Sequence, residues 1–278
     1  MTDTVLVTGS STGIGLATAV AAAKAGWRVV ATMRDTAKSS ALLKAAADAG
    51  VADLVDVRRL DVTDAEAAAA CVADVVRDHG RLDAVINNAG AGSVGTLEYK
   101  PVDEIRQAME VNFFGVLNVS KPALPHLRES AGRLITVTSV GGVVGQPFNE
   151  AYCAAKFAVE GYLESLAPLA AAHGVRVTVV EPGAVASEFV ANIGFDPADI
   201  DAVGPYVPQL RGYLARVTGE FQNAQTSEGA AAAIIEVLTA EQPAFRVQTS
   251  EAARSFVSAK LTDLDGSAVQ SLTSGWVA

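Results

Sequence analysis

The chain has 278 residues, of which 50% are hydrophobic and 19% charged, and its formal net charge is −10. This length and apolar content fit an α/β domain with a sizeable core. The acidic balance argues against nucleic acid or an anionic membrane as a partner, because both need a basic face.

Short β-branched segments alternate with longer helical ones, which predicts a doubly wound parallel sheet with helices on both faces. The predicted strands are Thr4–Thr8, Arg28–Met33, Val55–Leu60, Ala84–Asn87, Arg133–Ser139 and Val175–Glu181. Their almost continuous apolar character is typical of strands that are covered on both faces. The predicted helices are Ile14–Ala25, one that opens with a capping box at Thr63-Asp64-Ala65-Glu66, one from Pro101 to about Leu127 that is interrupted near Pro122 and Pro125, and one from Ala151 to about His173.

After Pro182-Gly183 the alternation of strands and helices ends. We expect a single Rossmann-type domain over residues 1–278. Residues 1–183 form the cofactor-binding and catalytic core, about 184–225 a substrate-covering lid, and about 226–278 a C-terminal helix, strand and tail. The side chains expected to make the lid apolar are Phe189, Phe195, Tyr206, Val207, Leu210, Tyr213 and Phe221.

Neither the cysteines nor the N-terminus suggests secretion. Cys71 and Cys153 lack metal-ligand spacing and are expected to be unpaired thiols, and acid clusters with metal spacing are absent from the sequence. The N-terminus does not resemble a signal peptide, and no apolar run reaches the roughly 18 residues of a membrane span. We therefore expect a cytoplasmic protein without a bound metal.

A glycine-rich segment, Thr8 to Gly15, lies between the first predicted strand and the first predicted helix. Its glycines let the backbone approach a pyrophosphate, and the helix N-terminus offers free N–H groups. The spacing G-x-x-x-G-x-G differs from the common dinucleotide fingerprint, but the strand–turn–helix context favours a nucleotide site over a structural turn. The candidate cofactor contacts in this segment are Gly9, Ser11, Thr12, Gly13, Ile14 and Gly15.

The end of the second strand distinguishes NADP from NAD, because the adenosine ribose lies beside it. An acidic residue there binds the 2′-hydroxyl and repels a 2′-phosphate, but this chain has Met33 followed by Arg34. A guanidinium matches phosphate oxygens, so NADP is the expected cofactor and NAD the less favoured one. Asp35 is expected to face away; the competing interpretation is a solvated Arg34.

Tyr152 and Lys156 are four residues apart on a predicted helix and therefore share one face. The pKa of a free tyrosine is near ~10. A neighbouring ammonium and the positive nicotinamide would lower that pKa, so that Tyr152 could exchange a proton near neutral pH. Ser139 ends an apolar strand at the edge where open α/β sheets bind ligands, and could hold a carbonyl oxygen. Taken alone, these features also fit a chance helix pair and a turn serine.

The segments Thr8–Gly15, Asn87-Asn88-Ala89-Gly90, Asn112, Ser139, Tyr152/Lys156 and Pro182-Gly183 occur together, in order and with familiar spacing. Over about residues 4 to 190 the chain resembles the short-chain dehydrogenase/reductase family, in its single-domain branch. The resemblance implies a Rossmann-type sheet of about seven strands and a Tyr/Lys/Ser/Asn tetrad. It also implies hydride transfer between NADP(H) and a carbonyl or alcohol, and a homodimer or homotetramer.

The resemblance implies a role for each matching residue. Tyr152 would be the general acid in reduction and the base in oxidation, Lys156 would bind the nicotinamide ribose, and Ser139 would orient the substrate oxygen. Asn112 would hold a water that links Lys156 to solvent. The other implied cofactor contacts are Asp61 and Val62 at the adenine, Asn88, Ala89 and Gly90 beside the central strand, and Pro182, Gly183, Val185 and Ser187 around the nicotinamide. Ser187 stands where the family commonly has threonine.

Val140 to Gly161, Ala31 to Asp35 and the tail from Arg246 to Gly266 are similar to the 17β-hydroxysteroid and retinol dehydrogenase branch of that family. The apolar lid predicts a lipophilic ketone, aldehyde or alcohol as substrate. The chain departs from the steroid enzymes at Arg216, where those carry a histidine. Arg216 could suit a polar substrate end or lie on the surface. Three alternatives stay open: oxidation of retinol or a steroid alcohol, a non-catalytic NADP-binding regulator, and a nucleotide-sugar epimerase.

Overall fold

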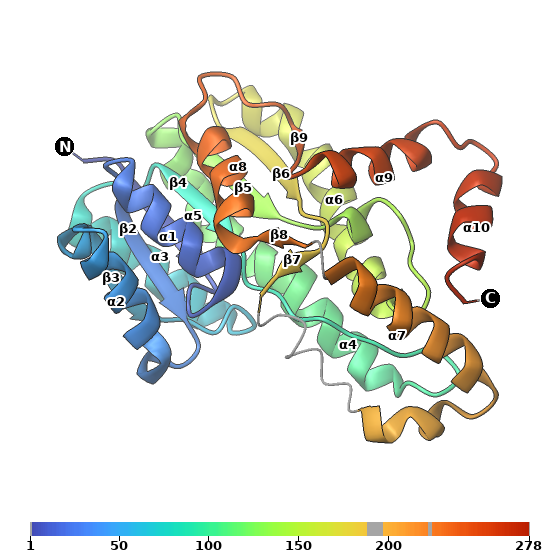
Figure 1. The fold of residues 1–278 in the computed structure, drawn as a ribbon. Coiled ribbons are helices and arrows are strands. Elements are labelled where there is room, and N and C mark those ends of the chain that lie inside the picture. Colours follow the sequence, from blue (N-terminus) through green and yellow to red (C-terminus); the bar gives the residue numbers. More distant parts are fainter. Residues whose placement is uncertain (1, 188–196, 222–223, 278) are drawn as a thin grey trace.

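In the computed structural model, which describes residues 2–187, 197–221 and 224–277, seven strands form one parallel sheet (Figure 1). The strands are β1 (Thr4–Thr8), β2 (Arg28–Met33), β3 (Val55–Arg59), β4 (Ala84–Asn87), β5 (Arg133–Val137), β6 (Arg176–Glu181) and β9 (Arg246–Gln248). Their order is β3-β2-β1-β4-β5-β6-β9, so the direction of winding reverses between β1 and β4. Ligands bind such sheets at this reversal, beyond the carboxyl ends of the strands. The predicted sheet is confirmed.

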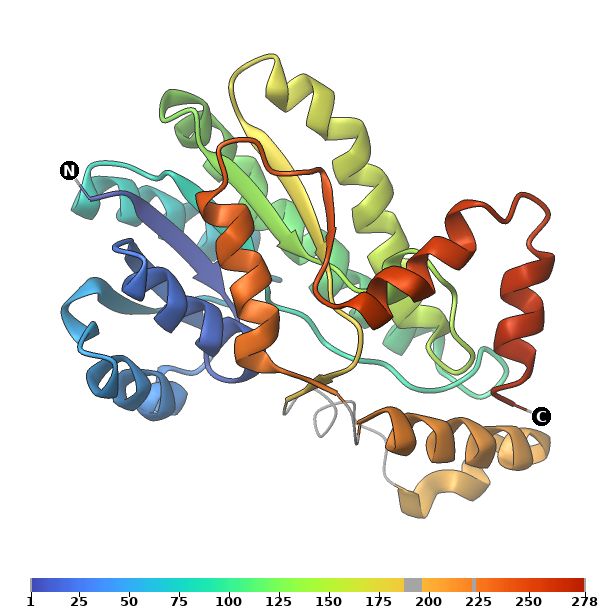
Figure 2. The same cartoon turned by 45° about the horizontal axis from the view of Figure 1, so that its top comes forward.

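Helices cover both faces of the sheet, and each face has its own core (Figure 2). On one face α1 (Gly13–Lys24), α2 (Ser40–Asp48) and α8 (Ser227–Thr239) cover inward residues such as Val5 and Ile86. On the other, α3 (Ala65–His79), α5 (Gly115–Glu129) and α6 (Glu150–Ala171) cover Leu6 and Val85. Neighbours along each strand thus point to opposite faces, and both are buried, which explains why the strands lack an alternating polar pattern.

The helical region after Pro101 is interrupted earlier than the prolines suggest. α4 (Val102–Met109) runs into a widened π-turn, Glu110–Phe114, and α5 then continues without a break through Pro122 and Pro125. The expected interruption near these prolines is wrong, because packing of α5 against α3 and the sheet outweighs the missing N–H groups. At the π-turn, Asn112 Nδ2 donates to the Ala108 carbonyl and compensates for the widened turn.

Two further sequence predictions need correction. The predicted capping box begins one residue too early: Asp64, not Thr63, is the N-cap of α3, and its Oδ1 accepts from Ala67 N at 2.9 Å. The region expected to lack the regular alternation of strands and helices is itself partly ordered: it contains a short strand β7 (Val185–Ala186), paired with β8 (Gln225–Thr226), and a full helix α7 (Val207–Phe221). Apolar residues at helical spacing on α7 bury its inner side against Phe148.

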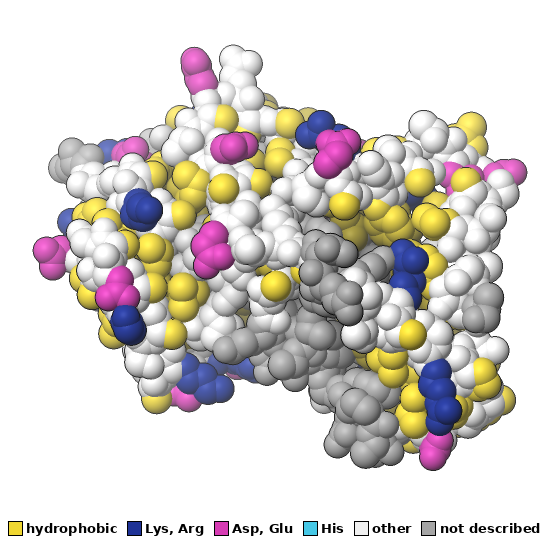
Figure 3. Space-filling view, viewed as in Figure 1, with side chains coloured by type: hydrophobic (Ala, Val, Ile, Leu, Met, Phe, Trp, Pro, Cys, Tyr) yellow, Lys and Arg dark blue, Asp and Glu magenta, His cyan; other side chains and the backbone are white. Residues whose placement is uncertain are grey.

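The C-terminal helices α9 (Glu251–Leu261) and α10 (Ser267–Ser274) extend from the carboxyl end of β9 toward α7 (Figure 1). Trp276 and Val277 then lie at the lid, since Val277 packs with the buried cluster of Phe148, Leu210 and Tyr213. None of the helices in the described part of the chain is both long and apolar enough to cross a bilayer. Acidic and basic side chains are interspersed with hydrophobic ones on the face shown in Figure 3. Cys71 and Cys153 are buried free thiols, as predicted.

Candidate active site

The glycine-rich segment forms a tight turn from β1 into α1 at the point where the sheet reverses. Gly9 and Gly13 have φ angles of +69° and +56°, which L side chains rarely adopt. A β-carbon on Gly15 would lie 2.2 Å from the carbonyl oxygen of Gly9, so this close approach requires glycine. The hydroxyl of Thr12, at the N-cap, makes no cap hydrogen bond, which leaves the first amides of α1 available to an anion.

The segment after β4 braces this turn. Thr8 Oγ1 accepts hydrogen bonds from the backbone amides of Asn88 and Ala89, each at 3.0 Å. Asn88 Nδ2 donates to the carbonyl oxygens of Thr8 and Gly9, also at 3.0 Å each. Asn88 and Ala89 therefore hold the glycine turn in shape, and their contact with the cofactor stays a prediction.

A pocket of about 340 Å³ opens at the carboxyl end of β2, on the adenosine side of the glycine turn. Its lining residues are Ser11, Met33, Arg34, Asp35 and Lys38. The structure therefore brings Ser11 and Arg34 together as expected, and adds the ammonium of Lys38, which sequence reasoning missed. The signal was a second cation four residues after Arg34, placed at the pocket by the short helix Thr36–Ser39.

Asp35 does not face away from this pocket, contrary to the prediction. Its carboxylate accepts a hydrogen bond of 3.0 Å from the backbone amide of Ala37 and caps the short helix that carries Lys38. The turn requires this cap, which explains why the carboxylate stays at the rim.

Asp61 and Val62, the predicted adenine contacts, follow β3 at the same edge of the sheet. Asp61 Oδ1 accepts from the Thr63 amide at 3.0 Å and from the Thr63 hydroxyl at 2.8 Å. Partial burial opposes ionisation of Asp61, but these hydrogen bonds and two nearby arginines lower its pKa, so the carboxylate is charged near neutral pH. The carbonyl oxygen of Val62 accepts from Asn118 of α5 at 3.0 Å, which fixes this segment.

Tyr152, Lys156 and Ser139 meet at the carboxyl end of β5. Ser139 lies just beyond the strand, and its hydroxyl is hydrogen-bonded to that of Tyr152. Ser139 Oγ also accepts from the amide of Gly141 at 2.9 Å, which orients the hydroxyl. Lys156 Nζ lies 5.7 Å from the centre of the Tyr152 ring and donates to the carbonyl oxygen of Val137 at 3.1 Å. The predicted shared face of the helix is thus present.

Burial determines the pKa values of this pair. It raises the pKa of Tyr152 to about 12, although the hydrogen bond with Ser139 acts to lower it. It also lowers the pKa of Lys156 to about 8, against the opposing charge of Glu160. The lowering of the Tyr152 pKa that is expected from Lys156 together with a bound nicotinamide stays a prediction; in the protein by itself, desolvation of the phenol raises that pKa.

Asn112 lies at the π-turn, fully buried, and connects that turn to the segment after β4. Its Oδ1 accepts from the amide of Ala91 at 3.2 Å, and its Nδ2 donates to the carbonyl oxygens of Ala91 and Ala108. A β-carbon on Gly90 would lie 3.0 Å from Asn112 Oδ1 and 3.6 Å from Lys156 Nζ. Asn112 and Lys156 thus flank Gly90, and only glycine leaves that space open.

The segment after β6 completes the site. The Val140 amide donates to the carbonyl oxygen of Pro182 at 2.9 Å, so Gly183 and Val185 follow directly beside the turn that carries Ser139. Ser187 lies over the glycine turn, because a β-carbon on Gly13 would come within 3.2 Å of Ser187 Cβ. The predicted contact of Ser187 with the nicotinamide stays a prediction; the observed neighbour of its side chain is the glycine turn at Gly13.

Comparisons with known proteins agree with this geometry. A family model described as short chain dehydrogenase matches residues 3–197. Retinol dehydrogenase 8 of Bos taurus is 36% identical over 95% of this chain and 86% of its own length. Human 17-beta-hydroxysteroid dehydrogenase type 1 is 35% identical over 95% and 82%, respectively. A solved short-chain dehydrogenase from Streptomyces avermitilis is 31% identical, with a TM-score of 0.78 over 99% of this chain and 98% of that one.

The chain is a short-chain dehydrogenase. It is accordingly an oxidoreductase that acts on an alcohol or a carbonyl group with a nicotinamide cofactor. The glycine turn follows β1 and the Ser139–Tyr152–Lys156 cluster lies at the end of β5, on the two sides of the reversal between β1 and β4.

The lid of this short-chain dehydrogenase packs on the loop that leads into α6. Leu210 and Tyr213 of α7 are buried with Phe148, and Asn149 Nδ2 lies 2.6 Å from the Tyr213 hydroxyl. Val207 is partly buried and Tyr206 is exposed at the tip. Phe189 and Phe195, and the side chain of Phe221, lie outside the described residues. Sequence reasoning missed Asn149, whose only signal was its position three residues before Tyr152.

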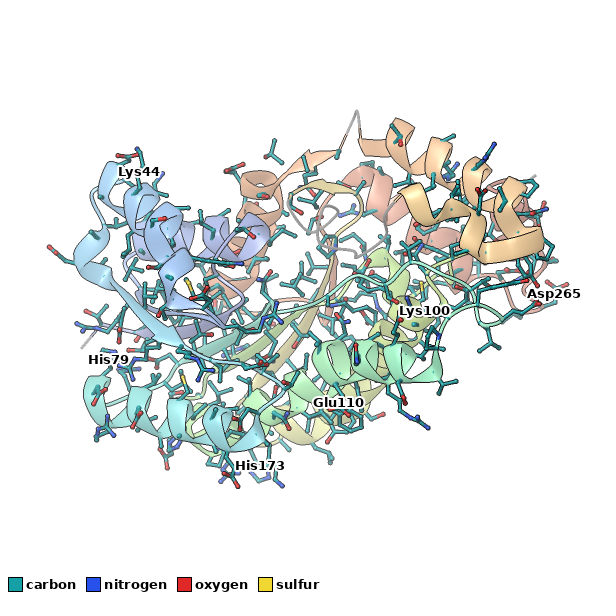
Figure 4. All side chains as sticks on the ribbon, turned by 90° about the horizontal axis from the view of Figure 1, so that it is seen from below. Lys44, His79, Lys100, Glu110, His173 and Asp265 are labelled. Atoms are coloured by element: carbon teal, nitrogen blue, oxygen red, sulfur yellow. The ribbon has the colours of Figure 1, made fainter. Side chains whose placement is uncertain are left out.

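The loop after β4 also contacts the lid. Lys100, labelled in Figure 4, donates to the carbonyl oxygen of Val94 at 3.1 Å and pairs with Glu104 at 3.0 Å. The ring of Tyr99 meets that of Tyr206 edge-to-face, with 6.0 Å between their centres. Lys100 thus anchors a loop that contacts the lid.

Arg216, the departure from the steroid enzymes, lies on the ring of Trp276, with 4.2 Å between its guanidinium carbon and the ring centre. Phe256 of α9 stacks on Trp276 at 5.8 Å. The guanidinium therefore ties α7 to the C-terminal segment through a cation–π contact.

Proposed function

We propose that this short-chain dehydrogenase is an NADP(H)-dependent oxidoreductase that interconverts a carbonyl and an alcohol on a lipophilic small molecule. The observation that carries the proposal is the hydrogen bond between Ser139 and Tyr152, which forms next to the buried ammonium of Lys156 and across the sheet reversal from the glycine turn. A non-catalytic regulator would need the glycine turn but not this cluster.

The proposed mechanism assigns one task to each side chain, while the bound nicotinamide supplies or accepts the hydride. In reduction, the hydroxyls of Ser139 and Tyr152 donate hydrogen bonds to the substrate carbonyl oxygen, and Tyr152 passes its proton to that oxygen. Lys156 stabilises the phenolate that remains and holds the nicotinamide ribose. In oxidation Tyr152 is the base. The water-holding role of Asn112 stays a prediction; its observed contacts support a role in shaping the wall at Gly90.

NADP is the proposed cofactor, because two cations share the pocket beside the expected ribose. Arg34 and Lys38 line it together with the hydroxyl of Ser11, and the position that would carry an acid in an NAD enzyme is Met33. One oxygen of the Asp35 carboxylate accepts from the Ala37 amide, and the charges of Arg34 and Lys38 outnumber this single negative charge at the pocket. Charge-assisted hydrogen bonds from both cations favour the 2′-phosphate.

We propose a lipophilic substrate because the described part of the lid is apolar on its inner side. This part consists of η5 (Pro197–Tyr206) and α7. Its inner side consists of apolar side chains such as Leu210 and Val203. Arg216 is engaged with Trp276, which weakens the idea that it binds a carboxylate of the substrate. The similarity to a retinol dehydrogenase and a 17-beta-hydroxysteroid dehydrogenase supports the same substrate class.

We also propose that the chain forms a homodimer or homotetramer in which α5 and α6 lie at the interface between subunits. Phe114, in the π-turn just before α5, and Phe157, Tyr162 and Leu169 on α6 are between 40% and 68% exposed. Large apolar side chains grouped in this way are typical of an interface. Cytoplasmic localisation stays a prediction from the sequence.

The proposal is tested by titrating the purified protein with NADPH and NADH, followed by cofactor fluorescence, and then by adding a panel of lipophilic ketones, aldehydes and alcohols. We expect NADPH-selective turnover. NADPH binding without turnover across the panel in either direction would favour a regulator, and a preference for NADH would contradict the assignment of the Arg34 pocket.

A further inference from the structure

Two buried glutamates share one arginine directly behind the catalytic cluster. Glu160 lies on α6, four residues after Lys156, and Glu181 is the last residue of β6; their side chains are 5% and 0% exposed. Arg246 of β9 places Nη2 3.3 Å from Glu160 Oε2 and Nε 2.6 Å from Glu181 Oε1. Because one guanidinium faces two buried carboxylates, the group has an excess negative charge when both are ionised.

Glu160 connects this group to the strand end that carries Ser139. Thr138, the residue before Ser139, has its hydroxyl 2.5 Å from Glu160 Oε1 and donates to it. The turn after Ser139 also rests on Glu160, since a β-carbon on Gly142 would lie 2.9 Å from Glu160 Cγ. The side chain of Glu160 therefore contacts Thr138 with its carboxylate and lies against Gly142 with its methylene group, before and after the residue that is proposed to hold the substrate oxygen.

Glu160 also acts on Lys156. Burial lowers the pKa of Lys156, and the negative charge of Glu160, one helical turn away, opposes that effect. Burial raises the pKa of Glu160 itself to about 7, while Thr138 and Arg246 lower it. Glu160 is thus largely ionised in the pH range in which Lys156, with a pKa of about 8, begins to lose its proton.

We infer that Glu160 is a positioning residue for the active site: its buried carboxylate keeps Lys156 in the ammonium form and holds the strand end that carries Ser139. The inference rests on the role proposed above for Lys156. The charged groups around Glu160 are Lys156 and Glu164 on α6, Glu181 on β6 and Arg246 on β9. Of these, Lys156 is the group assigned to the cofactor.

The test measures how the dissociation constant of NADPH varies with pH, from 7 to 10, in cofactor-binding titrations that require no turnover. In the wild type we expect binding to weaken as Lys156 loses its proton. In Glu160→Gln the neutral amide no longer supports the ammonium, so we expect the midpoint of this weakening to move about one pH unit lower. At pH 7 the dissociation constants of the wild type and Glu160→Gln for NADPH should differ by no more than about twofold, provided that the midpoint of the variant lies at or above pH 7.

Three variants make the result specific to the buried charge. Glu164→Gln removes a carboxylate that contacts the same Arg246, at 3.6 Å, but is 65% exposed, and should keep the wild-type midpoint. Glu160→Asp keeps the charge and should stay close to the wild type. Thr138→Val removes a hydrogen bond that favours the ionised carboxylate and should lower the midpoint in the same direction as Glu160→Gln, which keeps the test available if the latter does not fold.

The outcomes separate the inference from the function on which it rests. A wild-type affinity that does not change with pH would contradict the role proposed for Lys156, and the inference with it. A pH-dependent wild type with an unmoved midpoint in Glu160→Gln and Thr138→Val would overturn the inference alone. Equal weakening of binding at every pH in Glu160→Gln would show that Glu160 supports the strand end but does not act on the charge of Lys156, which would also overturn the inference.

Discussion

Gly15 faces Gly9 so closely that a β-carbon on Gly15 would lie 2.2 Å from the carbonyl oxygen of Gly9 and 2.4 Å from Asn88 Nδ2. The same carbonyl accepts a hydrogen bond from Asn88, so the turn cannot open at this point without losing its brace. The shape of the glycine turn therefore depends on the absence of a side chain at this position.

Gly15→Ala should accordingly destabilise the protein and abolish measurable cofactor binding. Overpacking of this kind typically costs about 1–3 kcal/mol of unfolding free energy. Thermal unfolding and NADPH titration measure the two effects. Gly219→Ala is the control, because a β-carbon there would meet nothing within 4 Å and Gly219 lies within helix α7. It should leave cofactor binding unchanged, and a tolerated Gly15→Ala would refute the steric argument.

Arg34→Ala and Lys38→Ala should each weaken NADPH binding while leaving NADH binding within about twofold. A lost charge-assisted hydrogen bond is worth about 1.5–3 kcal/mol, or roughly 10- to 100-fold in the dissociation constant. Lys44→Ala is the matched control, because Lys44 is exposed on α2 and pairs only locally with Asp48 (Figure 4). If the substitutions weaken the binding of NADPH and NADH equally, the pocket does not distinguish the 2′-phosphate from a hydroxyl group.

Tyr152→Phe should retain NADPH affinity and lose turnover by about 10²- to 10⁴-fold, the usual contribution of a general acid. The ring and its packing stay in place, and only the proton donor next to Ser139 is removed. Steady-state rates and cofactor titrations on the same preparation separate the two effects. Tyr162→Phe, on the same helix but 48% exposed, should behave as the wild type in turnover. Turnover by Tyr152→Phe near the wild-type rate would rule out the assignment.

Stability should depend on pH through Glu160. Its pKa in the folded protein is raised to about 7 from an ordinary value of 4.5, chiefly by burial. A raised pKa means that the contribution of this group to stability is present below about pH 4.5 and is lost as pH rises through 7. The full loss is on the order of 3 kcal/mol.

The melting temperature of Glu160→Gln minus that of the wild type should therefore increase as the pH rises from 4.5 to 7.5. Part of the pH dependence should remain in the variant, because burial raises the pKa of Glu181 as well. Glu164→Gln, which changes an exposed carboxylate, should follow the wild-type curve. Parallel curves for wild type and Glu160→Gln would show that Glu160 does not titrate in this range.

The local features of the active site could be predicted from the sequence because each depends on spacing along one element. Tyr152 and Lys156 share a face because a helix repeats every 3.6 residues, and the glycine segment turns where a strand meets a helix. The interruption of the helix that carries Asn112 could not be placed in this way. Prolines mark the weak points of an isolated helix, whereas the observed π-turn is supported by side-chain contacts to Ala91 and Ala108.

The sequence by itself determined the parallel sheet, the glycine turn between a strand and a helix, and the shared helix face of Tyr152 and Lys156, since periodicity and residue type carry that information. Only the tertiary structure brought Arg246 to Glu160, across 86 positions of the chain, and Arg216 to Trp276. It also set the pKa values of Tyr152 and Lys156. The physical reason is that burial and contacts between distant elements depend on how helices and strands pack, and neither is encoded in the spacing of any one segment.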